Sequence, residues 1–247
     1  MLTLDIENSP ALAYVFGLFD QNIGLAQVEE PGQVISVAYK WFDEEEVHFV
    51  SDFHDGHDTM IRVLWGLLDE ADIVVGYNSK NFDVKHLNRE FFEAGLGPPS
   101  SYKHIDLLMV MRSQFKFLSN KLDYIVQRLG LGAKVIHEGM RLWIACMKGD
   151  PEAWERMKKY NKEDVVITER LYDRVRAWIP NHPHLGVYTG LNDVCPVCLA
   201  PTLEEIGFAV AQVTSYKEYR CSECAHVVKG RTKRELEPVL YKTSKPV

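Results

Sequence analysis

Three short segments of the chain carry carboxylates at spacings that could hold a metal ion. Asp5 and Glu7 stand two apart in a segment of alternating apolar residues, so both side chains should leave the same face of a strand. Two such carboxylates repel each other unless a cation lies between them, and oxygen ligands suit Mg²⁺ or Mn²⁺. The same spacing also fits a strand end that faces solvent, which is the more common case for this pair alone.

The other two segments are equally ambiguous when each is taken singly. Asp83 follows a short apolar strand and opens a helix, where a carboxylate is also an ordinary N-terminal cap. Tyr160 and Asp164 lie four residues apart in a helical segment and therefore share one face of the helix. An exposed tyrosine–aspartate pair would have the same spacing, so neither segment alone identifies a site.

Hydrophobic periodicity predicts the elements that must position these residues. Strands are expected over 1–7, 34–42, 46–50, 73–77 and 104–106. Helices are expected over 58–70, 83–94 and 151–179, with further helices from 107 onward that break at 130–132 and resume near 137. Residues 8–33 form a long, irregular, aromatic-rich connection. Early strands followed by alternating strands and helices predict an α/β domain with a mixed β-sheet flanked by helices.

Together, the three segments resemble the exonuclease motifs of the DEDD superfamily, also called DnaQ-like exonucleases, which have a ribonuclease H-like fold. The matching motifs are Asp-x-Glu (Asp5, Glu7), Asn-x3-Phe/Tyr-Asp (Asn78, Phe82, Asp83) and Tyr-x3-Asp (Tyr160, Asp164). The resemblance covers roughly residues 1–178, and its tyrosine marks the DEDDy subgroup. The layout looks closest to the proofreading domains of family B DNA polymerases. Where many relatives have Thr or Ser after the glutamate, this chain has Asn8, at a position that is not a metal ligand in the family.

The resemblance implies a 3′–5′ exonuclease with two Mg²⁺ or Mn²⁺ ions and a preference for DNA over RNA. Asp5 would bridge both ions, Glu7 and Asp83 would each complete one or bind through water, and Asp164 would hold the ion on the nucleophile side. Tyr160 would orient the attacking water. The alternatives are a nucleic-acid-binding or recruitment module that has lost activity, and an endonuclease such as a junction resolvase on the same fold.

Residues that could contact the substrate are less sharply defined. Tyr77, Asn78 and Phe82 are candidates for the terminal nucleotide, because proteins that bind single strands stack bases on aromatic rings. Lys121 and Lys134 could meet phosphates, although a solvated surface explains them equally well. Asp106 follows a strand and is expected to cap the next helix rather than to bind metal.

Four of the five cysteines form two CxxC pairs, Cys195/Cys198 and Cys221/Cys224, and Cys146 stands alone. The two pairs resemble a Cys₄ zinc ribbon that holds one structural Zn²⁺. Their separation slightly exceeds the usual one and includes a predicted strand over 208–213. Two independent redox pairs are the alternative. A basic run at 229–234 could contact nucleic acid, and the ribbon could instead dock a replication or repair protein.

Composition places few limits on function. Hydrophobic residues make up 46% of the chain and charged residues 26%, which is ordinary for a globular protein. The net charge is −7, with about +2 from residue 195 on and −9 before it, and a metal-loaded acidic domain can still act on a polyanion. No membrane span or export signal is recognisable, so we expect no membrane partner and a cytoplasmic location. The predicted domains are an exonuclease domain at 1–180, a linker at 181–193 and a zinc ribbon with a basic tail at 194–247.

Overall fold

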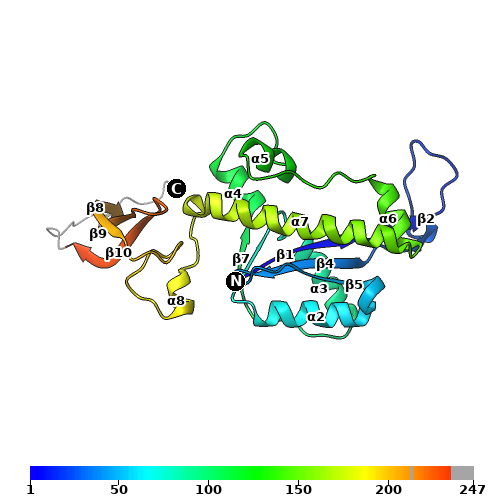
Figure 1. Ribbon diagram of the computed structural model, residues 1–247, viewed down its shortest axis with the longest axis horizontal. Helices are drawn as coiled ribbons and strands as arrows, with labels where there is room; N and C mark the ends of the chain where they lie inside the picture. Colours follow the sequence, from blue (N-terminus) through cyan, green and yellow to red (C-terminus); the bar gives the residue numbers. More distant parts are fainter. Residues whose placement is uncertain (212–213, 235–247) are drawn as a thin grey trace, which may run out of the picture. The chain divides into compact units, whose positions relative to one another are not determined.

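The computed structural model describes residues 1–211 and 214–234, and the chain divides into two compact units, residues 1–173 and 174–247 (Figure 1). Unit 1 is built on a mixed sheet of five strands in the order β5-β4-β1-β6-β7. The strands are β1 (Leu2–Asn8), β4 (Val34–Trp41), β5 (His48–Ser51), β6 (Ile73–Gly76) and β7 (Lys103–Asp106). β1 pairs antiparallel with β4 and parallel with β6, so the first strand lies at the centre of the sheet. Every strand predicted for this domain is present.

Helices cover both faces of this sheet (Figure 1). On one face, α2 (His57–Glu70) and α3 (Asp83–Glu93) share a core with the even-numbered residues of β1, namely Leu2, Leu4 and Ile6. On the other face lies α7 (Pro151–Val175), which packs with α6 (Met140–Met147) against Ile35 of β4. Because strand side chains alternate, the odd-numbered residues of β1 face α7. The mixed sheet with flanking helices confirms the predicted fold class.

The remaining helices of unit 1 include α4 (Leu107–Gln114) and α5 (Leu122–Arg128), which were predicted from residue 107 onward, and α1 (Asp52–Asp55), which was not predicted. The expectation of an irregular segment over 8–33 is corrected, because it contains the paired strands β2 (Leu12–Ala13) and β3 (Val28–Glu30) and a 3₁₀ turn, η1 (Leu25–Gln27). Strands of two or three residues are too short to show a period-two pattern in the sequence.

Unit 2 starts with the end of α7, which stops at Val175 and continues as a 3₁₀ turn, η2 (Arg176–Trp178), instead of running as α-helix to residue 179. A short helix, α8 (Leu185–Thr189), lies within the segment expected to be a linker. The antiparallel sheet β10-β9-β8 follows, made of β8 (Leu203–Ala211), β9 (Thr214–Cys221) and β10 (Val227–Arg234). β8 corresponds to the strand predicted over 208–213, of which residues 212–213 lie outside the described part.

Within unit 2, the ribbon is hydrogen-bonded to the segments that precede it. The ring Nδ1 of His226 lies 2.8 Å from the carbonyl oxygen of Ala177 in η2. The Leu185 N–H of α8 donates to the Pro196 carbonyl at 2.8 Å. Among the described residues of both units, no helix has the length and apolarity that crossing a bilayer requires.

Asp106, at the end of β7, organises the loop between β6 and α3. Its Oδ1 accepts from the Leu108 N–H at 3.0 Å, which confirms the predicted cap of α4. The same carboxylate also accepts from the N–H groups of Asn78, at 3.0 Å, and Lys80, at 3.1 Å. Asn78 has a positive φ of 62°, a conformation that asparagine tolerates better than most residues. One buried side chain therefore holds both a helix terminus and the loop that leads to Asp83.

Asp106→Ala should lower the free energy of unfolding by about 2–4 kcal/mol, since it removes an N-cap and leaves partly buried N–H groups without an acceptor. Urea unfolding followed by circular dichroism measures the change. Asp58→Ala is the matched control, because Asp58 is exposed in the first turn of α2 and does not cap it. Equal, small losses for the two variants would contradict the role given to Asp106.

Candidate active site and cysteine cluster

Three carboxylates converge between the central strand and the long helix. Asp5 and Glu7 leave the α7-facing side of β1, and Asp164 comes from α7 itself. One carboxylate oxygen from each lies within 4.8 Å of the other two. Asp164 is only 1% exposed. The structure therefore brings together residues that are up to 159 positions apart in the sequence.

Asp83 lies beside this group but is held differently. It is the first residue of α3, it is 3% exposed, and its Oδ1 accepts from the Ile6 N–H at 3.1 Å. The pairing of β1 with β6 is recorded at Leu2 and Thr3 only, so the Ile6 N–H has no strand partner there. Asp83 thus satisfies a backbone donor of β1 and places its charge next to Asp5. It is not one of the three carboxylates that meet within 4.8 Å.

Burial raises the pKa of all four carboxyl groups, and repulsion from neighbouring carboxylates of the cluster adds to this at Asp5 and Glu7. Burial is the largest cause for Asp5, whose pKa is raised well above its usual value, with further contributions from Asp83, Glu7 and Asp164. Burial also raises the pKa of Glu7 to about 8 and that of Asp83 to about 7. The pKa of Asp164 is raised by burial as well. The arrangement is therefore unfavourable when fully ionised, unless positive charge is added.

Lys134 supplies one positive charge to this cluster. Its ammonium group forms an ion pair with Asp164 and lies 3.4 Å from the Tyr160 hydroxyl and 5.3 Å from the centre of the Tyr160 ring. It lowers the pKa of Asp5, Glu7 and Asp164, against the larger effect of burial. The sequence suggested either a phosphate contact or a solvated lysine here. In the structure, Lys134 is 30% exposed and reaches into the carboxylate cluster.

Tyr160 is buried and remains protonated. It is 8% exposed, and its ring makes edge contacts with His137, at 4.7 Å between centroids, and Trp143, at 6.0 Å. Burial raises the pKa of its hydroxyl, and the nearby charges of Glu7 and Asp164 raise it further. The hydroxyl can therefore donate a hydrogen bond to a group at the carboxylates, but it cannot serve as a base near neutral pH.

Asn161 is a site residue that the sequence reasoning missed. Its Nδ2 donates to Asp5 Oδ2 at 2.8 Å and to the Asp5 carbonyl at 3.1 Å, and its Oδ1 accepts from Ser36 Oγ at 3.1 Å. It is fully buried. A sequence signal existed, because Asn161 stands three residues before Asp164 and so lies on the same side of the helix. Its contacts fix the orientation of the Asp5 carboxylate.

The four predicted substrate-binding residues lie around the loop held by Asp106 and at the start of α5. Tyr77 donates its hydroxyl to the Asn120 carbonyl at 2.6 Å, so only its ring is available to a ligand. Phe82 is 41% exposed and its ring lies against His86. Lys121 is exposed at the N-terminus of α5. Contact of these residues and of Asn78 with a substrate stays a prediction.

The carboxylate cluster has the features that a divalent cation would need. Asp164 Oδ1 is a carboxylate oxygen and hence a strong hydrogen-bond acceptor. It is buried and has no hydrogen-bond partner among the described residues. Such an oxygen is costly to bury unless it binds a donor or a cation. All the converging ligands are oxygens, which favours Mg²⁺ or Mn²⁺ over Zn²⁺. The residues present therefore fit the divalent ions that the sequence predicted.

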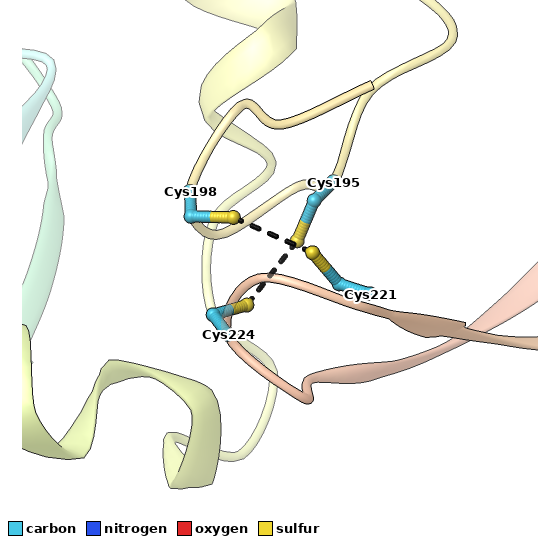
Figure 2. A group of neighbouring side chains, drawn as sticks. All are labelled: Cys195, Cys198, Cys221 and Cys224. Carbon is cyan, nitrogen blue, oxygen red and sulfur yellow. Dashed lines mark hydrogen bonds between the residues drawn. The ribbon is translucent and has the colours of Figure 1, made fainter. Parts of the chain in front are cut away.

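The four paired cysteines meet in unit 2, with their sulfurs pointing toward one another from two loops (Figure 2). Cys195 and Cys224 are 3.6 Å apart at Sγ, as are Cys198 and Cys221. These distances are close to the edge of about 3.8 Å expected for a tetrahedron of sulfurs that bind zinc at about 2.3 Å. All four cysteines are free thiols and their ligand atoms lie within 4.8 Å of one another. The cluster could hold one zinc ion.

Without divalent ions, unit 1 should become less stable as the pH rises. Because the folded-state pKa values of Glu7 and Asp83 are raised to about 8 and about 7, their stabilising contribution is complete below about pH 4 and is lost through these values. We expect a loss of up to about 7 kcal/mol between pH 5 and pH 9, since the pKa values of Glu7 and Asp83 together lie about five units above pH 5 and one unit corresponds to about 1.4 kcal/mol. Denaturant unfolding in buffer without added divalent ions measures it.

Asp5→Asn should weaken this pH dependence, and added Mg²⁺ or Mn²⁺ should abolish it in the unmodified protein. Glu152→Gln is the control, since Glu152 is exposed in the first turn of α7. A stability that does not change with pH, or that rises toward pH 9, would contradict the electrostatic description of the cluster.

Comparison with known families matches residues 4–176 to the family model RNase_H_2, described as RNase_H superfamily. A search of curated proteins finds no match. The matched range includes the four carboxylates, Tyr160, Asn161 and Lys134, and it ends before the cysteine cluster. This membership supports a metal-dependent nuclease that binds nucleic acid. With its mixed sheet, flanking helices and converging carboxylates, the chain belongs to the RNase_H superfamily.

Proposed function

We propose that this protein is a metal-dependent 3′–5′ exonuclease that hydrolyses phosphodiester bonds at nucleic-acid 3′ ends, with DNA favoured over RNA. The observation that carries the proposal is the buried Tyr160 hydroxyl beside the converging carboxylates of Asp5, Glu7 and Asp164, with Asp83 next to them. A carboxylate cluster alone suits any nuclease of this superfamily. The tyrosine one helical turn before Asp164 is the feature that the chain shares with the DEDDy exonucleases.

Two Mg²⁺ or Mn²⁺ ions would be held by the four carboxylates. When bound, such ions supply the positive charge that lowers the pKa of water and stabilises the leaving 3′ oxygen. Asn161 keeps the Asp5 carboxylate in one orientation through two hydrogen bonds. Tyr160, which keeps its proton, donates a hydrogen bond to the attacking water and so positions it.

Lys134 contributes a positive charge to the same site. Its ion pair with Asp164 places an ammonium group where cation charge is needed. Its ammonium group also lies 3.4 Å from the Tyr160 hydroxyl, so if divalent ions took up Asp164, Lys134 would remain near the groups that would surround the reacting phosphate. An ammonium group there stabilises the charge that develops on the phosphate oxygens.

The 3′-terminal nucleotide would be recognised by groups on two sides of the carboxylates. Phe82 offers a partly exposed ring for base stacking, and Tyr77, Asn78 and Lys121 lie in or near the same loops. On the other side, a cavity of about 240 Å³ is lined by Asn8, Met140 and Trp143, among others. Trp143 also touches the Tyr160 ring, so this cavity adjoins the proposed reacting groups.

Unit 2 would add a structural zinc ribbon to the nuclease. We assign one Zn²⁺ to the four cysteines, as a closed four-coordinate site that leaves no position for water or substrate. We retain an exonuclease domain at 1–180 and a ribbon at 194–247, the latter including residues 235–247, which lie outside the described part. The ion would stabilise the ribbon without taking part in catalysis.

Wild-type protein with Mg²⁺ or Mn²⁺ should shorten a 5′-labelled oligonucleotide stepwise from its 3′ end. Tyr160→Phe should lower the rate about 10²–10⁴-fold while metal binding, measured by calorimetry, is retained, because only the water-positioning hydroxyl is lost. Tyr124→Phe, a tyrosine of α5 outside the cluster, is the control. A single internal cut would indicate an endonuclease, and no cleavage by folded, metal-loaded protein would indicate a binding module.

Protein purified without chelator should contain about one zinc per chain by elemental analysis. After denaturation with chelator and without reductant, all five cysteines should react as thiols. Cys221→Ser should lose the zinc, whereas Cys146→Ser, outside the cluster, should keep it. Two disulfides in the zinc-free protein, with only one reactive thiol, would instead identify redox pairs.

A further inference from the structure

Residues 9–33 form an arm that joins the end of β1 to the start of β4 and stands away from the rest of unit 1 (Figure 1). At its base, the Ser9 N–H donates to the Gln33 carbonyl at 2.8 Å, and Ser9 Oγ accepts from the Gln33 N–H at 3.0 Å. Further out, the Tyr14 N–H donates to the Gln27 carbonyl at 2.8 Å, and the Gln27 side chain donates back to the Tyr14 carbonyl at 2.9 Å. All 25 positions of the arm are described and none is buried. Polar contacts therefore hold the arm in shape, without an apolar core of its own.

The apolar side chains of the arm are exposed to solvent. Phe16 is fully exposed, and Leu18, Phe19 and Leu25 are 87%, 83% and 93% exposed. With the other exposed apolar residues of the arm, they present roughly 1,000 Å² of surface, since one aromatic side chain alone contributes about 150–250 Å². The largest apolar patch on a typical monomer measures only about 300–600 Å². An isolated pair of strands as short as β2 and β3 is also marginally stable in water, so the arm needs a partner that covers it.

The charge of the arm indicates what kind of partner fits it. Residues 1–39 contain no lysine, arginine or histidine, and the arm carries three exposed carboxylates, Asp20, Glu29 and Glu30. Nucleic acid and anionic membranes present phosphates, which are held by cations and repelled by carboxylates. The arm therefore fits a protein surface that is apolar and carries exposed cations.

The helix α6 of the same chain offers such a surface. Met140, Ile144 and Met147 follow one another at helical spacing and share one side of α6, where they are 59%, 45% and 43% exposed. Arg141 and Lys148 are exposed along the edge of this apolar stripe. We refer to these five residues as the α6 face. It has the apolar area and the positive charge that the arm requires of a partner.

The arm and the α6 face lie at the same end of unit 1 (Figure 1). The cavity of about 240 Å³ is lined both by the base of the arm, at Ser9 and Pro10, and by the start of α6, at Met140. Within one chain the arm does not cover the α6 face, since both are exposed. A two-fold axis at this end lets each arm reach the α6 face of a second copy, so that two identical contacts form at once. Two contacts of this size match the total of about 1,600 Å² that a stable complex buries.

We propose that the arm and the α6 face form the interface of a symmetric homodimer, in which each arm packs on the α6 face of the second copy. The rings of Phe16 and Phe19 would be buried against the apolar stripe, and the carboxylates of the arm would face Arg141 and Lys148. This association does not depend on the exonuclease activity, so either proposal can fail without the other.

Analytical ultracentrifugation of the full-length, zinc-loaded chain over a dilution series tests the proposal. The unmodified protein should sediment with twice the 28.4 kDa mass of one chain. Phe16→Ser with Phe19→Ser should raise the dissociation constant of the dimer about 100-fold, because buried aromatic anchors carry most of the binding energy of an interface. Phe92→Ser is the matched control, since Phe92 is as exposed as Phe19 but lies on α3, which covers the other face of the sheet from α6.

Exchange of charges identifies the two surfaces that meet. One variant carries Glu29→Lys with Glu30→Lys, and the other carries Arg141→Glu with Lys148→Glu. Each variant alone should associate about tenfold more weakly, because both of its contacts then pair like charges. An equal mixture of the two should associate as tightly as the unmodified chain, since opposite charges face each other at both contacts of the mixed dimer.

Circular dichroism and zinc content verify that each variant is folded. A protein that is monomeric at every concentration would overturn the proposal, and so would an equal weakening by Phe92→Ser. A mixture that fails to restore association would show that the arm meets a surface other than the α6 face. If the protein were monomeric and Phe16→Ser with Phe19→Ser weakened binding of a single-stranded oligonucleotide, the arm would contact bases and the homodimer would be wrong.

Discussion

Carboxylate oxygens of Asp5, Glu7 and Asp164 are held within 4.8 Å of one another, and Asp83 lies beside them, between a buried strand and a buried helix. Water would normally screen such charges, but here burial is the largest cause of their raised pKa values. The fold therefore keeps mutually repelling carboxylates close together at one place. The packing of the rest of unit 1 must offset the free-energy cost of this repulsion. Divalent cations offset this repulsion, which couples metal binding to stability.

Rigid elements and buried hydrogen bonds meet this requirement. Asp5 is fixed by Asn161, which is anchored in turn by Ser36 on the neighbouring strand. Asp83 accepts from the backbone of β1, and Asp106 holds the loop before it. Lys134 contributes a charge of the opposite sign. Since Asp5, Asp83 and Asp164 each have a partner from another part of the chain, these ligands are oriented before any ion arrives, as a catalytic centre requires.

The two units offer metal ions different chemistry. The cluster in unit 1 presents oxygen atoms only, whereas that in unit 2 presents four sulfurs at separations close to a tetrahedral edge. Hard Mg²⁺ and Mn²⁺ prefer oxygen and keep open positions for water and substrate, while thiolates prefer zinc and close its coordination. The donor atoms of the two clusters thus suit different kinds of metal ion.

The spacing of residues along the sequence was enough to predict much of this architecture. The two-residue spacing of Asp5 and Glu7 and the four-residue spacing of Tyr160 and Asp164 determine which side chains share a face, and each CxxC pair determines half of a sulfur cluster. The central strands and long helices followed from the same apolar patterns. The strands β2 and β3 were missed, because elements of two or three residues carry no readable period.

Only the tertiary structure decided which faces meet. The hydrogen bond from Asn161 to Asp5, 156 residues apart, and the ion pair of Lys134 with Asp164 depend on how α7 docks on the sheet. The helix α8 likewise forms within a segment that the sequence indicated as a linker. Sequence spacing specifies the side-chain directions within one element. Contacts between elements arise from packing, which no local pattern encodes.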